Sequence, residues 1–292
     1  MSGIALGIVL ASAFLHAGWN YLLKKSDRKI AFTWWFLLAS VVIFAPFFLY
    51  LCYSSGKTIP TWGWICIVGS GLIHAVYFGC MGSAYQRGDL SVVYPLARWS
   101  GPLFVPVLAV MLLREEIAPL GMLGIGLIIG GIYSIHLRAF TTSSFLEPFR
   151  ALRGGASLWA LFTGLAIAAY SLVDKLGVGF VEPPVYIYLM ILVTWLAITP
   201  WVLVRERRWL APEWRRHRAS IFAVGFFSSF TYLMILFALR LSKVSYVAAV
   251  REVSIVLSAY FGIVWLGERH GRQKVVGAVL IAAGVVAIGL SR

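Results

Sequence analysis

Apolar residues form long uninterrupted stretches along this chain, and the charged residues between them come in short clusters. Ten stretches are long enough, or nearly so, to cross the hydrocarbon layer of a bilayer, roughly 30 Å thick, as helices. They cover residues 3–23, 31–53, 62–85, 90–113, 118–137, 156–173, 184–204, 219–239, 244–266 and 274–290. Inside lipid, backbone polar groups must be satisfied within each segment. The pattern therefore predicts an all-α membrane protein with ten transmembrane helices.

The composition agrees with lipid as the main solvent. Of the 292 residues, 61% are hydrophobic and 12% are charged, with a mean hydropathy of +0.87, whereas soluble domains carry about 25% charged residues. The first apolar stretch lacks a basic leader and a convincing cleavage site, so we expect a retained helix rather than a signal peptide. Cys52, Cys66 and Cys80 show no metal-ligand spacing, so we expect no metal and no cofactor.

The distribution of basic residues predicts the orientation. The net charge is +14, and Lys and Arg gather after the first, third, fifth, seventh and ninth predicted helices, above all in the loop RERRWLAPEWRRHR at 205–218. Basic loops stay on the cytoplasmic side. These five loops should therefore be cytoplasmic, with both termini outside, in a bacterial-type inner membrane. Because the basic residues flank apolar spans and form no soluble domain, we expect no nucleic-acid binding.

The two halves of the chain are related in sequence. One constant spacing aligns Arg87 with Arg240, Arg98 with Arg251, Leu113 with Leu266, Glu115 with Glu268, Gly124 with Gly277 and Gly131 with Gly284. We expect a first repeat at residues 1–138, a connecting loop at 139–154 and a second repeat at 155–292. Five spans is an odd number, so the second repeat must enter the membrane in the opposite sense, as in transporters that work by alternating access.

The closing segments of both halves place a Glu at a helix end before a glycine-rich span: LLREEIAPLGMLGIGLIIGGI from Leu112 and WLGERHGRQKVVGAVLIAAGV from Trp265. In these motifs the chain resembles the EamA branch of the drug/metabolite transporter superfamily, over nearly its whole length. The resemblance implies a ten-helix fold with a central cavity, and export or exchange of small metabolites, commonly amino acids, without ATP hydrolysis. The opening HAGWN at 16–20 resembles a subgroup that includes members associated with phosphonate use. Arg114 stands where many members have Gly.

Three charged residues lie well inside the predicted spans: Arg98, Arg251 and Glu252. Each is about 12 Å from its helix start, where a charge costs about 3 kcal/mol unless it faces a partner or a wet cavity. Arg251 and Glu252 are adjacent and point about 100° apart, so we expect Glu252 to meet Arg98 across the repeat axis. That contact is either a structural salt bridge or a substrate and gating site. In such a site the guanidinium groups would hold a carboxylate, and Glu252 an amino group or a coupling proton.

Polar-tipped rings in the same spans are further candidates for a substrate site, although most aromatic residues serve as interface anchors or packing. They are His16, His74, Tyr77, Tyr94, Trp99, Tyr170, Tyr232 and Tyr246. Three prolines, Pro95, Pro102 and Pro106, predict that span 90–113 is more distorted than its counterpart 244–266.

Glycines in the last span of each half should serve helix packing, because they allow close backbone approach. They include Gly126, Gly130, Gly131, Gly277 and Gly284. We expect Glu115 and Glu268 to cap a helix or pair at the membrane surface rather than to touch substrate.

The preferred hypothesis is a secondary transporter that exports amino acids or similar small metabolites by alternating access around a midplane cavity. An importer or exchanger of small organic anions, phosphonates included, is the alternative. We do not expect an enzyme, because HExxH, GxSxG and Walker A motifs are missing, or a channel, because no filter-like loop or charge ring is visible. The expected partners are a small-molecule substrate, the bilayer and a coupling proton, with the chain a monomer or weak dimer.

Overall fold

The computed structural model describes residues 1–56, 58–87, 90–137, 139–142, 144–145, 155–266 and 271–291, and within these ranges it leaves out the side chains of 24, 55, 82–87, 90–98, 155–157 and 261–266. Its helices are α1 (Gly3–Lys24), α2 (Lys29–Ser55), α3 (Thr61–Arg87), α4 (Leu90–Leu113), α5 (Pro119–His136), α7 (Gly155–Phe180), α8 (Pro183–Arg205), α9 (Arg207–Leu241), α10 (Val244–Arg251), α11 (Val253–Leu266) and α12 (Arg272–Leu290).

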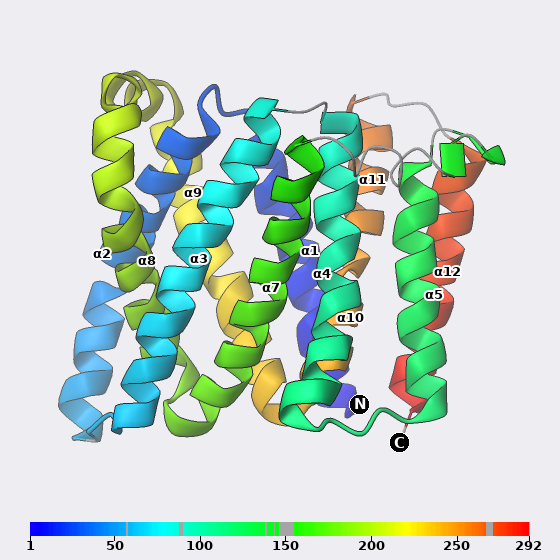
Figure 1. Cartoon of the computed structure of the whole chain (residues 1–292). Helices are drawn as coiled ribbons and strands as arrows, with labels where there is room; N and C mark the ends of the chain where they lie inside the picture. The colour runs from blue at the N-terminus through cyan, green and yellow to red at the C-terminus, as the bar shows by residue number, and fades with distance from the viewer. Residues whose placement is uncertain are drawn as a thin grey trace.

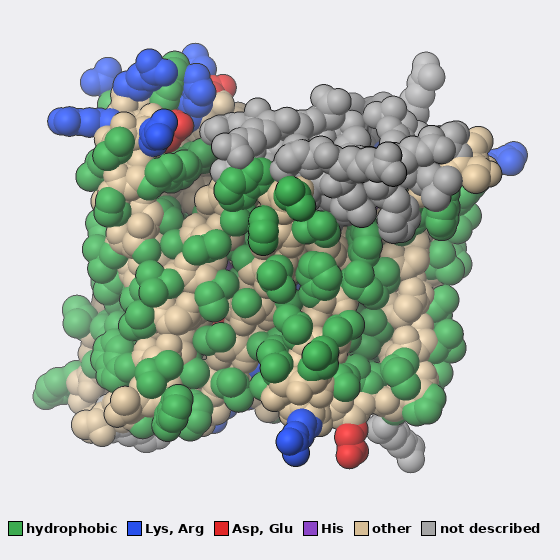
Figure 2. Space-filling model, viewed as in Figure 1, with side chains coloured by type: hydrophobic (Ala, Val, Ile, Leu, Met, Phe, Trp, Pro, Cys, Tyr) green, Lys and Arg blue, Asp and Glu red, His purple; other side chains and the backbone are tan. Residues whose placement is uncertain are grey.

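Eight helices of the described chain are long and apolar enough to cross a membrane. The two remaining predicted spans are α4 and the consecutive pair α10 and α11. Figure 2 shows hydrophobic side chains covering the middle of one face, with Lys and Arg gathered at one end, over the α8–α9 corner. The prediction of an all-α membrane protein with ten spans in two five-span halves is confirmed.

The two halves, α1 to α5 and α7 to α12, are inverted and interleaved. Their first helices, α1 and α7, run in opposite directions (Figure 1). The packing repeats across the halves, since α3 packs on α7 and α8 just as α9 packs on α1 and α2. The chain termini lie together, where the Met1 amine donates to the Ser291 carbonyl at 2.8 Å. Most of the large helix interfaces therefore join one half to the other.

Helices α5 and α12 approach closely through glycines, as expected. A Cβ atom built on Gly131 would lie 2.7 Å from the Gly277 carbonyl oxygen, and one built on Gly284 would lie 2.6 Å from that of Gly124. Gly130 points elsewhere, with nothing within 4 Å of its Cβ position, and the same holds for Gly126. Packing is thus confirmed for one glycine face of α5, while Gly126 and Gly130 lie off the interface.

The expectation that residues 205–218 form a basic loop is wrong, because most of this segment is helical. α9 begins at Arg207 and changes direction at His217, which has non-helical φ and ψ of −122° and 15°. Leu210 and Glu213 are buried on one side of this first part, whereas Arg216 is exposed. The charges therefore lie on one face of an amphipathic helix. The helical spacing of its buried residues is hard to recognise in the sequence because so many of the residues are arginines.

Span 244–266, rather than span 90–113, contains the interruption, so the expectation drawn from the prolines is also wrong. The helix stops at Arg251 and restarts at Val253. At Glu252 the backbone hydrogen bonds connect residues three apart instead of four apart. Glu252 N–H donates to the Ala249 carbonyl at 3.1 Å, and Ile255 N–H donates to the Glu252 carbonyl at 2.9 Å. α4 continues without a break through its three prolines, which remove donors but leave the helical path intact.

The turn after α4 contains Arg114, which stands where many EamA members have Gly, and Glu115, whose predicted capping role is confirmed. Arg114 has a φ of +53°, the left-handed region that favours Gly. Glu115 then accepts hydrogen bonds from the backbone N–H groups of Val244 at 2.7 Å and Ser245 at 3.2 Å. The carboxylate thereby caps α10 of the other half and meets the positive end of its dipole. Glu268 lies outside the described residues.

We predict that Gly131→Ala destabilises the protein and that Gly130→Ala does not. The new methyl group at 131 would force α5 and α12 apart, and such overpacking costs about 1–3 kcal/mol. At 130 the methyl group meets open space, and Ala gains about 0.5–1 kcal/mol over Gly inside a helix. Thermal unfolding of the two detergent-solubilised variants measures the difference, and equal midpoints would contradict the assigned interface.

Arg114→Gly should raise the unfolding temperature. A side chain in the left-handed region costs about 1–2 kcal/mol, and Gly removes this cost. The greater flexibility of Gly in the unfolded chain offsets about 0.5–1 kcal/mol of the stability gained. Arg114→Ala is the matched control, because it removes the charge but keeps the unfavourable φ. If Ala stabilises as much as Gly in the same thermal assay, the charge and not the backbone is responsible.

Candidate functional site

A cavity of about 1500 Å³ lies between helices of both halves. Its described lining comes from α1, α2, α3, α4, α7, α8, α9, α10 and α11, together with Glu252 between the last two. The walls are mainly apolar with a few polar groups, as in small-molecule sites. The polar and charged side chains along the wall include His16, Asn20, His74, Thr163, Tyr170, Ser171, Thr194, Tyr232, Arg251 and Glu252.

Arg251 and Glu252 line the cavity at the helix interruption. The Arg251 guanidinium carbon lies 5.7 Å from the centre of the Tyr232 ring, in a cation–π contact. Glu252 is 7% exposed, and its Oε2 has no hydrogen-bond partner among the described residues. An interrupted helix beside a cavity is a common way to build a binding site in a transporter. The expected partner of Glu252, Arg98, has a side chain outside the described residues.

The most deeply buried charge near the cavity is Asp174 on α7, which is 0% exposed. Its Oδ1 accepts hydrogen bonds from the Ser70 hydroxyl on α3 and from the Tyr186 hydroxyl on α8, the latter at 2.8 Å. Its Oδ2 accepts a hydrogen bond from the Tyr232 hydroxyl on α9. Asp174 is therefore held by three hydroxyl groups from three helices, one layer behind the cavity wall.

His74 connects this carboxylate to the cavity. Its Nδ1 lies 2.9 Å from the Ser70 carbonyl and 3.2 Å from the Ser70 hydroxyl. A carbonyl oxygen only accepts, so Nδ1 carries the hydrogen and Nε2 is the acceptor nitrogen of the neutral ring. The ring stacks on Tyr170 at 4.0 Å and meets Tyr232 edge-on at 5.5 Å. The imidazole is thus fixed in orientation as well as in tautomer.

Sequence reasoning missed Asp174 because it placed a helix end at residue 173. The Asp174–Lys175 pair resembles the end of a span, yet α7 runs on to Phe180. Lys175 reaches away from Asp174 and donates to the carbonyls of Leu239 at 2.6 Å and Ser242 at 2.9 Å, at the end of α9. The usable signal was the proline pair Pro183–Pro184, which marks the next helix start and leaves apolar residues after Lys175 that need a helix.

The structure sorts the remaining predicted residues. His16 and Tyr77 line the cavity with His74, Tyr170 and Tyr232. Tyr246 does not belong to the described lining, because it is buried between α5 and the C-terminus: it bonds the Ser291 hydroxyl at 2.9 Å and accepts from Ala118 N–H at 3.3 Å.

Trp99 also falls outside the described lining. Its ring packs against Tyr133 of α5, with the ring centres 6.4 Å apart. The side chain of Tyr94, like that of Arg98, is outside the described residues.

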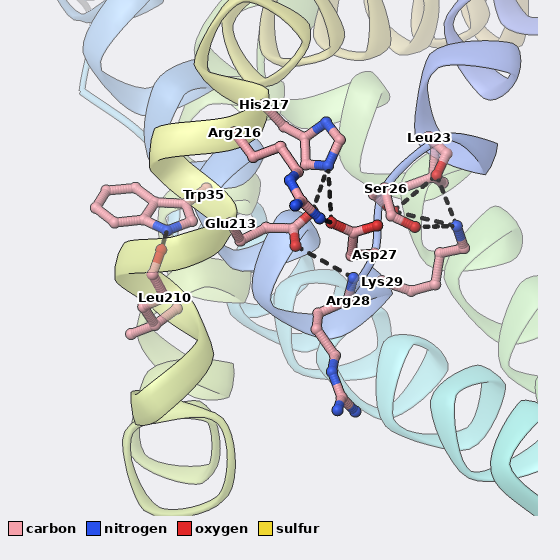
Figure 3. A network of polar contacts seen from close by, with 10 residues as sticks. All are labelled: Leu23, Ser26, Asp27, Arg28, Lys29, Trp35, Leu210, Glu213, Arg216 and His217. Carbon is pink, nitrogen blue, oxygen red and sulfur yellow. Dashed lines mark hydrogen bonds and ion pairs between the residues drawn. The ribbon is translucent and has the colours of Figure 1, made fainter.

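One end of the cavity reaches a polar network between the two halves (Figure 3). Asp27, in the α1–α2 loop, pairs with Arg216 at 2.6 Å and with His217 at 3.4 Å, and these contacts hold the pKa of Asp27 below its ordinary value. Arg28 N–H donates to Glu213 at 3.2 Å. Asp27, Glu213 and His217 offer ligand atoms within 4.8 Å of one another, but the Arg216 guanidinium already neutralises Asp27. We interpret the group as an ion-pair network and not as a metal site.

Inverted five-helix halves around a mainly apolar cavity with a few polar and charged groups are typical of a membrane transporter of small molecules. The family model of the EamA-like transporter family matches residues 2–137 and 155–290, so the chain belongs to this family, which is part of the drug/metabolite transporter superfamily. Each matched range contains five of the spans. The resemblance inferred from the paired motifs is confirmed.

Two further proteins are similar to this chain. A relative from Sinorhizobium sp., named "Uncharacterized transporter in cobO 3'region", is 26% identical over 134 residues, which are 45% of this chain and 94% of that protein. A solved crystal structure is similar with a TM-score of 0.74 and 14% identity, covering 99% of this chain and 98% of its own. The structural likeness shows the fold alone, and the relative is similar to this chain over less than half of this chain's length.

Tyr186→Phe should lower stability by about 1.5–3 kcal/mol, the usual contribution of a hydrogen bond to a charged group. The variant removes one donor from a fully buried carboxylate and preserves the ring. Tyr188→Phe is the matched control: the Tyr188 ring stacks on Phe48 at 4.1 Å, and loss of its hydroxyl should cost less than about 0.5 kcal/mol. Thermal or denaturant unfolding of both variants would show equal losses if the Asp174 network does not support the fold.

Proposed function

We propose that this protein is a secondary transporter that exports amino acids or similar small metabolites by alternating access. The observation that carries the proposal is the placement of Arg251 and Glu252, adjacent at a helix interruption, on the wall of the cavity between the halves. Such a position holds a cation and an anion in contact with a wet space inside a membrane.

The charges favour a zwitterion or an anion over a cation. Arg251 offers a planar set of donors that suits a carboxylate. The Oε2 of Glu252, which no described residue hydrogen-bonds, suits an ammonium group. The aromatic rings of Tyr170, Tyr232 and Trp19 form part of the wall and suit the apolar part of an amino acid. Glu252 and Arg251 would then fix the two ends of the substrate backbone.

The orientation supports export. The described lining reaches Asp27, Arg28 and Glu206, at the end where the Lys and Arg residues gather in Figure 2. Basic segments stay in the cytoplasm, so this end would face the cytoplasm of a cell with the protein in its inner membrane. A cavity that reaches the cytoplasmic end can load a metabolite from inside the cell.

The second candidate is import or exchange of small organic anions, phosphonates included. Arg251 in the cavity, and Arg28 and Lys29 at its basic end, favour this class, because a phosphonate or dicarboxylate needs cationic partners on its path. The two candidates differ in the demand for Glu252: an ammonium group needs this carboxylate, whereas a dianion is repelled by it.

Counterflow in proteoliposomes tests the function. Vesicles loaded with an unlabelled amino acid should accumulate the same labelled amino acid transiently, and vesicles loaded with methylphosphonate should not accumulate labelled phosphonate. Substrates should cover several side-chain classes. Counterflow of the anions without counterflow of any amino acid would overturn the preferred candidate in favour of the second.

Arg251→Ala, Arg98→Ala and Glu252→Gln should reduce amino-acid counterflow to the background of protein-free liposomes while the proteins remain monodisperse. Arg240→Ala is the matched control, because this arginine pairs with Glu182 at 2.5 Å at the exposed end of α9. Wild-type flux in Arg251→Ala would eliminate the proposed site, and equal loss in Arg240→Ala would show that the effect is not specific to the cavity.

A further inference from the structure

Asp174 is separated from the cavity by side chains that can each pass a proton. Tyr232 lines the cavity and donates its hydroxyl directly to Asp174 Oδ2. His74 lines the cavity and reaches Oδ1 through the Ser70 hydroxyl. Both routes consist of contacts at hydrogen-bond distance. We propose that Asp174 is the proton-binding group through which this transporter is coupled to a proton gradient, an inference that rests on the transport function proposed above.

The hydroxyl groups around Asp174 accommodate both of its protonation states. Ser and Tyr hydroxyls can each donate or accept, so a protonated carboxyl group can donate to one of them after that hydroxyl rotates. Glu115 differs, because two of its three hydrogen bonds come from the backbone N–H groups of Val244 and Ser245, which only donate. All three partners of Asp174 are hydroxyl groups, so each can accept from a protonated carboxyl group as well as donate to an ionised one.

The proton transfer balances along both routes. Through His74, a proton from cavity water binds Nε2, the Nδ1 proton passes to the Ser70 oxygen, and the Ser70 proton passes to Asp174 Oδ1. The imidazole ends neutral in its other tautomer, and the carboxyl group ends neutral. Through Tyr232, the phenolic proton moves to Oδ2 as the phenolic oxygen takes a proton from cavity water. In either case one O–H or N–H bond forms for each that breaks.

Several titratable and charged groups surround this carboxyl group. α3 contributes His74 and the Cys66 thiol, whose own backbone carbonyl accepts from Tyr186. α8 and α9 contribute Tyr186 and Tyr232. On α7 itself Tyr170 lies one turn away, stacked on His74, and Lys175 is committed to the end of α9. From α10, Arg251 contacts the ring of Tyr232, and Glu252 lines the same cavity, while the side chain of Arg98 on α4 is outside the described residues.

The Tyr232 ring links the proton site to the proposed substrate site. The Arg251 guanidinium carbon lies 5.7 Å from the centre of this ring, and the Tyr232 hydroxyl donates a hydrogen bond to Asp174. The charges of a substrate bound at Arg251 and Glu252 change the field at Asp174, and a proton on Asp174 changes the affinity of these two residues for the substrate. These two effects are equal by thermodynamic linkage. The geometry thus supplies the coupling as well as the proton-binding group.

Asp174→Asn tests the proposal in proteoliposomes containing the full-length protein. Two assays are run on each protein: counterflow, without a pH gradient, of an amino acid that gives wild-type counterflow, and transport driven by a pH gradient, with proton movement followed by a trapped pH-sensitive dye. Glu182→Gln is the matched control, because it makes the same carboxylate-to-amide change at an exposed helix start.

We expect Asp174→Asn to retain measurable counterflow while losing both gradient-driven transport and substrate-induced proton movement, with Glu182→Gln behaving like wild type. Gradient-driven transport at the wild-type rate in Asp174→Asn would overturn the proposal. So would wild-type counterflow that is indifferent to a pH gradient of either sign, although the transport function would then stand. Failure of every substrate in wild-type counterflow would instead refute the transport function itself.

Asp174→Glu keeps the proposal testable if the Asn variant does not fold. It preserves a titratable carboxyl group, so gradient-driven transport should persist with an altered pH dependence. Binding of the amino acid to the wild-type protein, measured across pH, gives a second result without any substitution. The proposal requires the affinity to depend on pH and this dependence to change in Asp174→Glu, and an identical profile in both proteins would contradict it.

Discussion

A single buried carboxylate joins four helices of this bundle. Asp174 on α7 accepts hydroxyl hydrogen bonds from α3, α8 and α9, and α3 belongs to the other half of the chain. A carboxylate at this depth is costly unless it is paired or hydrogen-bonded. The hydroxyl groups must therefore converge where Asp174 lies, which fixes the positions of α3, α8 and α9 around α7 and, with them, the wall of the cavity.

The helix packing follows the internal repeat, whereas the acidic residues of the candidate site do not. The glycine contacts between α5 and α12 occur in matched pairs, Gly124 with Gly284 and Gly131 with Gly277. With the spacing that aligns Arg98 with Arg251, the position that corresponds to Glu252 in the first half is Trp99. Equivalent surfaces let the inverted halves interleave, and the acidic residue at Glu252 without an acidic counterpart at position 99 makes the cavity wall asymmetric.

The sequence carries strong signals for the fold and weaker ones for the site. Apolar length predicted the spans, and Arg98 with Arg251 indicated the repeat. The helical character of 205–218 was hidden because arginines dominate its exposed face, although Leu210 and Glu213 follow a helical period. Asp174 was hidden because a charge beside another charge resembles a span end. Its importance depends on hydroxyls from Ser70, Tyr186 and Tyr232, which meet only after folding and leave no local pattern.

Packing decides which parts of this molecule can move relative to one another. The halves defined by sequence do not form separate packing units, because α5 is packed on α12, and α3 on α7, through the largest helix interfaces of the described chain. A separate apolar cluster joins α2, α8 and α9 near the basic end, around Phe32, Val202 and Ile221. Across that end the ion pair of Asp27 with Arg216 is exposed, and exposed pairs contribute only about 0–1 kcal/mol. Because Asp174 ties α8 and α9 to α3 and α7, a change of access would begin at this exposed ion pair and leave the glycine interface of α5 and α12 closed.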